Sequence, residues 1–235
     1  MFERTSGVLM HITSLPSPHG VGSLGKAAYD FIDFLEAAGQ RYWQVLPLGH
    51  TGFGDSPYQC FSAAAGNYFM IDLDTLVEDG LLTTAEIKAA EFDHTPDKVD
   101  YIALAETRPA LLRKAFARIT EDMAKEIASF RRKNRGWIED YSLFMALKEE
   151  KYEGRALWDW PDKAVRSRVP AALAAVREEL KEEIDFRVFL QYLFFQQWNA
   201  LRAYAGEHGV QIIGPNCPGI ISPARSNVGI TPPDI

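Results

Sequence analysis

The 235-residue chain has few cysteines, no excess of positive charge and no long apolar run. Its two cysteines, Cys60 and Cys217, lie far apart, and no apolar run follows the charges of residues 1–7, so no signal peptide is expected. Two free thiols in a cytoplasmic protein are therefore expected rather than a disulfide framework. No apolar stretch is long enough to span a bilayer, so the sequence predicts no membrane partner.

The charge balance argues against a second class of partner. The formal net charge is −7 and the pI is about 5.3, and no basic face is evident, so a nucleic acid is not expected as a partner. The single basic cluster, residues 131–135, closes a predicted helix, where cations complement the helix dipole. Hydrophobic residues make up 47% of the chain, which is enough to build the core of one domain or of one domain with an insertion.

The first fifty residues predict a strand, a helix and a second strand. Residues 7–12 have the pattern of a short buried strand, and residues 42–46 have that of the next one. Ser23 is expected to cap the intervening helix, which ends at Gly39. The apolar residues of that helix fall at helical spacing: Ala27, Phe31, Phe34, Leu35 and Ala38. This order is a βαβ unit, which implies parallel pairing of the strands.

The middle of the chain is predicted to be mostly helical. Residues 68–73 form a short apolar run that we expect to be extended, and residues 83–86 fit a capping box. Residues 100–151 have a helical pattern that Pro109 should kink or restart and that residues 134–136 should break.

The last predicted elements are two helices and a strand. Residues 170–181 indicate a polar helix, and residues 184–208 indicate the longest helix, apolar around nearly its whole axis. Such a helix is covered on both sides, and we place it between a sheet and a helical insertion. Residues 210–213 predict a third strand.

Residues 41–67 are the stretch around which the chain is organised. Pro47 ends the second strand, and the three glycines at 49, 52 and 54 predict a tight, irregular loop. The loop carries Phe53, Asp55, Ser56 and Tyr58. A flat ring beside short polar groups suits a sugar, which has apolar C–H faces and hydroxyl edges. The alternative is an ordinary strand-to-helix loop with a structural Asp-Ser-Pro turn, and these residues alone favour that alternative.

Two other features also have a functional and a structural interpretation. His11 lies at the carboxyl end of the first predicted strand, where parallel α/β proteins bind ligands, but a hydrogen-bonded structural histidine is the favoured interpretation. Trp158 and Trp160 either form a sugar platform or pin a helical subdomain onto a sheet, and the second is favoured.

Several long motifs together resemble the amylomaltases, also called 4-alpha-glucanotransferases or disproportionating enzymes. The resemblance covers residues 1–213. Its longest segments read GVLMHITSLPSPHGVGSLGKAAYDFIDFL, AGQRYWQVLPLG and GFGDSPYQCFSAAAGN, and shorter ones read VDY, WDWP and FLQYLFFQQW. His50 and Tyr68 each stand where the family usually has proline, and Cys60 replaces a small residue.

The resemblance implies a fold, an activity and a ligand. The family is a (β/α)8 TIM barrel with helical insertions that transfers α-1,4-glucan segments between malto-oligosaccharides by a retaining mechanism, without a cofactor or a metal. The implied partners are malto-oligosaccharides or glucans derived from starch or glycogen. Asp55, Ser56 and Tyr58 match the family's Asp-Ser-Pro-Tyr loop beside the glucan cleft. Phe53 stands where Tyr is common, at an accessory glucan contact to which Tyr101 is also assigned.

The resemblance assigns no catalytic residue to this chain. The family chain is much longer, and its nucleophile, its acid/base and a third carboxylate lie on later strands, which no Asp or Glu here matches. The chain is therefore expected to supply at most three of eight strands, an incomplete barrel that is inactive alone. The alternative is a non-catalytic fragment that binds maltodextrin.

The last residues resemble a different family. Residues 214–235 read GPNCPGIISPARSNVGITPPDI and are similar to the α subunit of succinyl-CoA ligases, with Asn216, Cys217 and Pro218 matching its CoA-side loop. A chimera with a CoA-ligase tail is one interpretation. The last residues are also similar to a later amylomaltase string, so an internal deletion is another.

These observations give an α/β fold class and four segments. Residues 1–67 are expected to form the first βαβ unit of the barrel with the glucan-site loop, and residues 68–183 a mostly helical insertion. Residues 184–213 add a helix and the third barrel strand, and residues 214–235 an atypical tail.

Overall fold

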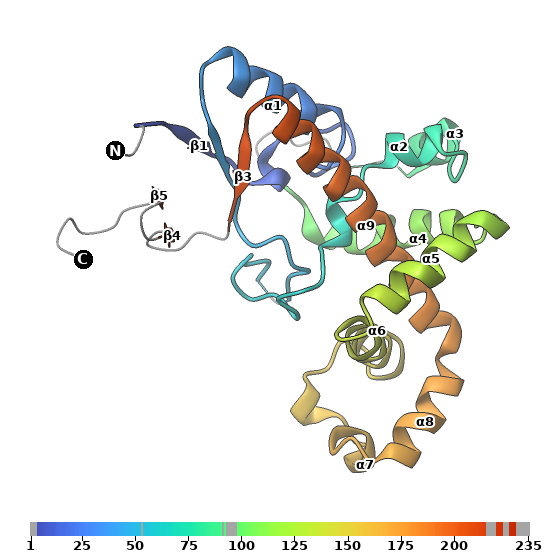
Figure 1. Ribbon diagram of the computed structural model, residues 1–235. Coiled ribbons are helices and arrows are strands. Elements are labelled where there is room, and N and C mark those ends of the chain that lie inside the picture. Colours follow the sequence, from blue (N-terminus) through green and yellow to red (C-terminus); the bar gives the residue numbers. More distant parts are fainter. Residues whose placement is uncertain are drawn as a thin grey trace. The chain divides into compact units, whose positions relative to one another are not determined.

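A computed structural model of the protein describes residues 4–52, 54–90, 92, 98–214, 220–222 and 226–228 (Figure 1). The chain forms two compact units, the first made of residues 1–108 and 194–235 and the second of residues 109–193. Both divisions fall inside helices, one in α4 (Tyr101–Phe116) and the other in α9 (Lys181–Glu207).

The first unit contains a parallel sheet of three short strands. Strand β1 (Gly7–Leu9) pairs with β2 (Tyr42–Gln44), which pairs with β3 (Gln211–Ile213), in the order β1-β2-β3. The register aligns Gly7 with Tyr42 and Tyr42 with Gln211. The predicted βαβ unit and its parallel third strand are confirmed, although each strand is shorter than its apolar run.

The other elements of the first unit are mostly short. They are a 3-10 turn at Ile12–Ser14, α1 (Lys26–Ala37), a 3-10 turn at Tyr68–Met70, α2 (Leu73–Glu78) and α3 (Thr84–Ala89). Helix α3 has the predicted capping box between Thr83 and Glu86. Strands β4 (Ile220–Ser222) and β5 (Ser226–Val228) form an antiparallel pair.

Helix α1 buries Leu35 of the predicted face but leaves Phe34 exposed. Its buried side chains are Ala28, Ile32 and Leu35, whereas Phe34 is 58% exposed. Phe31 packs edge-on against the fully buried Trp43 of β2, with 5.0 Å between ring centroids. The expected cap is wrong, because Gly25 is the N-cap and the Ser23 hydroxyl donates to Asp72 Oδ2 over 2.7 Å. The predicted end at Gly39 is confirmed by a φ of +68°.

Residues 68–73 are not extended, because Asn67 and Asp72 each cap a turn there. Asn67 Oδ1 accepts a bond of 3.0 Å from the Phe69 amide, which starts the 3-10 turn. Asp72 Oδ1 then accepts from the Thr75 amide at 2.9 Å and starts α2. The Asp72 amide also donates to Gln197 Oε1 over 2.7 Å, which ties α2 to α9.

The second unit consists of helices. Its complete elements are α5 (Glu121–Lys133), α6 (Ile138–Ala146), a π turn at Leu147–Lys151, a 3-10 turn at Leu157–Asp159, α7 (Lys163–Arg166) and α8 (Pro170–Glu179). The predicted break at residues 134–136 is confirmed, since Asn134 is the C-cap of α5. Pro109 does not restart the helix, because α4 continues through it. Burial of Leu111 and Leu112 in the next turn outweighs the lost backbone bond.

The two tryptophans of the Trp-Asp-Trp-Pro loop have different environments. Trp160 is 3% exposed and belongs to the apolar core of the second unit, where its ring lies 4.7 Å from that of Tyr152 and 5.6 Å from that of Phe144. Trp158 is 76% exposed. The prediction that both rings pin helices onto a sheet is therefore wrong, because one ring packs among helices and the other lies in solvent.

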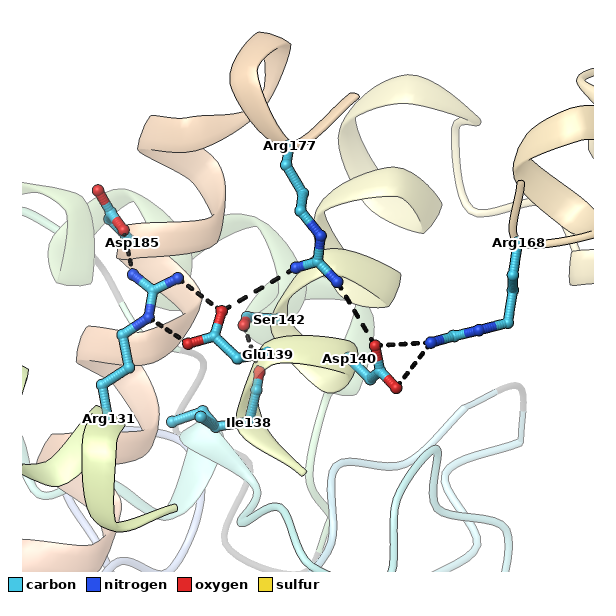
Figure 2. Close-up of polar contacts among 8 residues, drawn as sticks. All are labelled: Arg131, Ile138, Glu139, Asp140, Ser142, Arg168, Arg177 and Asp185. Atoms are coloured by element: carbon cyan, nitrogen blue, oxygen red, sulfur yellow. Dashed lines mark hydrogen bonds and ion pairs between the residues drawn. The ribbon is translucent and has the colours of Figure 1, made fainter. Parts of the chain in front are cut away.

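Charged side chains connect the helices of the second unit (Figure 2). Arg131, at the end of α5, places its Nε 2.6 Å from Glu139 Oε1 and its Nη1 2.7 Å from Asp185 Oδ1. Arg177 reaches the neighbouring Asp140, with 3.5 Å between Nη2 and Oδ1. The basic cluster therefore links three helices as well as complementing the dipole of its own helix.

Candidate functional site

The loop after β2 is a narrow hairpin. Residues 51 and 60 form an antiparallel bridge, and the Phe61 amide donates to the His50 carbonyl over 3.1 Å. At the tip, Gly54 and Asp55 both have positive φ, at 83° and 53°. Aspartate tolerates this left-handed conformation better than most residues, which explains an Asp at this turn. The predicted irregular loop is therefore built around this turn.

Ser56 and Tyr58 continue the tip of the hairpin. The Tyr58 amide donates to the Ser56 hydroxyl over 3.4 Å, and the Gln59 amide donates to the Ser56 carbonyl over 2.9 Å. The Ser56 side chain thus has a local turn-forming role, as the structural alternative expected. Tyr58 is 54% exposed.

A pocket of about 180 Å³ lies at the carboxyl ends of β1 and β2. Residues after β1 form one wall, residues 46–57 form another, and Tyr101 of α4 completes it. The lining residues are His11, Thr13, Ser14, Leu46, Pro47, Gly49, Thr51, Asp55, Pro57, Asn67, Met70 and Tyr101. Ligand sites of parallel α/β proteins occur at this edge of the sheet.

The charge of Asp55 acts on Tyr101 across this pocket. Burial raises the pKa of the Tyr101 hydroxyl, and the negative charge of Asp55 raises it further, whereas a hydrogen bond with Thr13 lowers it. Burial also raises the pKa of the Asp55 carboxyl above its usual value. The structure therefore brings together two residues that lie 46 positions apart in the sequence.

His11 differs from the favoured structural interpretation. It is 9% exposed, and its Nδ1 is fully buried without a hydrogen-bond partner in the described part of the chain. Desolvation lowers the pKa of the imidazole to about 4. His11 is thus a neutral pocket residue rather than a hydrogen-bonded structural histidine.

The structure therefore places only some of the predicted site residues in the pocket. Asp55 and Tyr101 line the pocket, while Ser56 and Tyr58 lie on the adjoining hairpin tip and are not among its lining residues. Phe53 lies outside the described residues. Sequence reasoning missed Thr51, Asn67 and Met70, which also line the pocket. For Thr51 and Asn67, their positions in the stretch of residues 41–67 were the available signal; Met70 lies in the 3-10 turn that follows.

Other predicted features concern thiols, metals and membranes. Cys60 is a free cysteine, while Cys217 lies outside the described residues. Within the part that the structure describes, no group of three or more His, Cys, Asp or Glu side chains is arranged to hold a metal ion. None of the helices there is both long and apolar enough to cross a membrane.

Comparison with known proteins assigns a family. A family described as 4-alpha-glucanotransferase matches residues 10–227. The 4-alpha-glucanotransferase of Streptococcus pneumoniae serotype 4 is 46% identical over 215 residues, which cover 91% of this chain and 42% of that protein. The enzyme of Thermus thermophilus is also 46% identical, over 90% of this chain and 42% of that protein. The chain thus spans less than half the length of these relatives.

A solved structure gives the same result. The amylomaltase from Streptococcus agalactiae in complex with acarbose is 43% identical, with a TM-score of 0.86 over 89% of this chain and 42% of that one. The family match extends into the tail as far as residue 227, and no comparison supports a succinyl-CoA ligase there. Asn216 and Pro218 lie outside the described residues, as Cys217 does.

The three parallel strands, the hairpin after β2 and these matches agree with one another. The chain belongs to the 4-alpha-glucanotransferase family.

Proposed function

We propose that this chain forms the N-terminal part of the glucan-binding site of a 4-alpha-glucanotransferase and does not transfer glucan by itself. The observation that supports this most directly is the pocket at the carboxyl ends of β1 and β2, lined by Asp55 and Tyr101. The relative from Streptococcus agalactiae was solved with acarbose, an oligosaccharide, which supports a glucan as the ligand. Ser56 and Tyr58 on the hairpin, and Phe53 beside them in the sequence, are proposed as further contacts.

The proposed lack of activity follows from the chemistry of the reaction. Retaining glycosyl transfer needs one carboxylate as nucleophile and a second carboxyl group as general acid, about 5 Å apart. Among the residues that line the pocket, Asp55 is the one carboxylate. In the complete enzyme the remaining carboxylates are proposed to come from later strands of a (β/α)8 barrel, of which β1, β2 and β3 are the first. No cofactor takes part in this proposal, and a cytoplasmic location stays a prediction.

The transfer proposal is tested by incubating the purified chain with maltotriose and sizing the products. We expect maltotriose to remain unchanged. Glucose appearing together with longer maltodextrins would contradict the proposal, because it would require a complete set of catalytic groups in this chain or its self-assembly.

The binding proposal is tested by calorimetry with maltoheptaose. Asp55→Asn should weaken binding by about three- to tenfold, because the pocket loses a charged hydrogen-bond acceptor. The matched control is Asp122→Asn, which changes an exposed carboxylate that pairs with Lys125 on α5. Equal affinity of the two variants would contradict the placement of the site.

A further inference from the structure

His11 is a titratable pocket residue to which the family resemblance gives no role. It lies two residues after β1, is almost fully buried and lines the same pocket as Asp55. Buried polar atoms are usually hydrogen-bonded, so an unpaired one inside a pocket calls for an explanation. His11 Nδ1 and Thr51 Oγ1 are both buried and unpaired within the described residues.

The two ring nitrogens of His11 are not equivalent. Nδ1 is buried and has no hydrogen-bond partner within the described residues. Nε2 also makes no hydrogen bond there, but it is not among the fully buried atoms, so it is open to the pocket. A neutral imidazole carries one donor nitrogen and one acceptor nitrogen. Because a buried, unpaired N–H is costlier than an unpaired lone pair, the proton belongs on Nε2. His11 therefore offers the pocket a neutral N–H donor.

The rest of the pocket complements this donor. Asp55 supplies a carboxylate acceptor, and Thr13 and Tyr101 each supply a hydroxyl. Pro47 and Met70 add apolar surface. A cavity of about 150 Å³ can hold benzene, so the volume of about 180 Å³ here suits one six-membered ring.

We propose that His11 is a further glucan-binding residue that donates from Nε2 to one hydroxyl of a single glucosyl ring, while Asp55 accepts from the adjacent hydroxyl. Two neighbouring hydroxyls present both a donor and an acceptor, which is what a neutral N–H and a carboxylate together recognise. The inference rests on the proposed function, because both concern the same pocket.

The charge of Asp55 and the neutral state of His11 also indicate which ligands bind poorly. A carboxylate beside an uncharged imidazole offers no cation to a phosphate group, so a sugar phosphate meets repulsion from Asp55 without compensation. Within the described residues the pocket-lining side chains include no Lys or Arg. The inference therefore includes a preference for unphosphorylated glucan.

The test compares three variants of the full chain by calorimetry with maltoheptaose. His11→Phe keeps a flat ring but loses the donor, and should weaken binding about tenfold. His11→Gln keeps an N–H near the position of Nε2 and should stay within about threefold of the unmodified chain. His208→Phe, at the residue after α9 and not among the pocket-lining residues, should leave the affinity unchanged. Glucose 6-phosphate should not compete.

A second measurement does not depend on how a variant folds. Imidazole nitrogen resonances of the unmodified chain should show His11 as the neutral Nε2–H tautomer and should shift when maltoheptaose is added. Unchanged His11 resonances at saturating maltoheptaose, or unaltered affinity of a folded His11→Phe variant, would overturn the inference. If Asp55→Asn still weakened binding in that case, the proposed function would stand. A folded, unmodified chain that binds no maltoheptaose would overturn both.

Discussion

Arg108 shows how a charged side chain is accommodated in the interior of the first unit. Arg108 is fully buried, and its guanidinium donates from Nη1 to the Ile71 carbonyl over 2.7 Å and from Nη2 to the His19 carbonyl over 3.3 Å. Burial lowers its pKa to about 10, while the charges of Asp72 and Asp74 oppose that shift. Arg108 therefore remains charged at neutral pH and joins three segments of the first unit.

Replacing Arg108 should destabilise the protein, because two buried backbone carbonyl groups would lose their hydrogen-bond donor. Arg108→Met leaves two acceptors without their donor and should lower the free energy of unfolding by about 2–4 kcal/mol. Arg202→Met changes an exposed arginine and should shift it by less than about 0.5 kcal/mol. Urea denaturation of both variants measures the difference, and equal midpoints would show that Arg108 makes no net contribution.

His11 should give the protein a stability term that depends on pH. Its pKa is about 4 in the folded state and about 6.5 when exposed, so the unfolded state binds the proton more readily. The contribution is therefore fully present above pH 6.5 and is lost as pH falls towards 4, by up to about 3 kcal/mol. Asp55 acts in the opposite sense, because its raised pKa favours proton uptake by the folded state.

The contribution of His11 is isolated by comparing the unmodified chain with His11→Gln. The glutamine variant should lose less stability between pH 6.5 and pH 4, as measured by urea denaturation across that range. Parallel pH profiles would show that His11 is not desolvated in the folded protein.

At the scale of elements, the loop of residues 158–161 contains one buried and one exposed tryptophan. Trp160 lies against Phe144 and Tyr152, and its indole N–H donates to the Arg155 carbonyl over 3.1 Å. Trp158, two residues earlier, contributes only its carbonyl, which accepts a bond of 2.6 Å from Arg166 Nη1. A short 3-10 turn thus points one ring into the helical core and the other into solvent.

The two tryptophans provide a matched pair of substitutions. Trp160→Ala should lower the free energy of unfolding by about 3–5 kcal/mol, because it leaves a cavity among aromatic rings. Trp158→Ala should change it by less than about 0.5 kcal/mol. Thermal unfolding followed by circular dichroism compares them, and a large effect of Trp158→Ala would indicate a contact that the structure lacks.

At the scale of the whole molecule, the first unit exposes apolar side chains on its sheet and on the helix that follows β1. Leu9 of β1 is 51% exposed and Phe34 of α1 is 58% exposed. Large exposed apolar groups promote association between copies of a chain. The Streptococcus pneumoniae relative is more than twice as long as this chain. Its additional helices and strands could cover apolar side chains such as Leu9 and Phe34.

Self-association is therefore expected to depend on Phe34. Phe34→Gln should lower the weight-average mass measured by sedimentation at high protein concentration, because it removes an exposed ring. Lys26→Gln, on the same helix, removes an exposed charge and should not lower it. The same mass for Phe34→Gln and the unmodified chain would show that this surface does not mediate contact.

Local sequence patterns were enough to predict the features that depend on neighbouring residues. The capping box at Thr83 and Glu86, the end of α1 at Gly39 and the parallel βαβ unit all follow from neighbouring residues or from strand order. Long motifs, read against a known family, were enough for the family itself.

The tertiary structure decided what depends on distant partners. Ser23 bonds to Asp72 across 49 positions instead of capping α1, and the buried face of α1 is set by Trp43 of a later strand. The pocket likewise depends on the fold, because only the tertiary structure brings His11 after β1, Asp55 after β2 and Tyr101 of α4 together. Periodicity and helix capping depend on a few neighbouring residues, so the local sequence was enough to predict them. Burial and long-range contacts depend on the whole chain, so only the tertiary structure decided them.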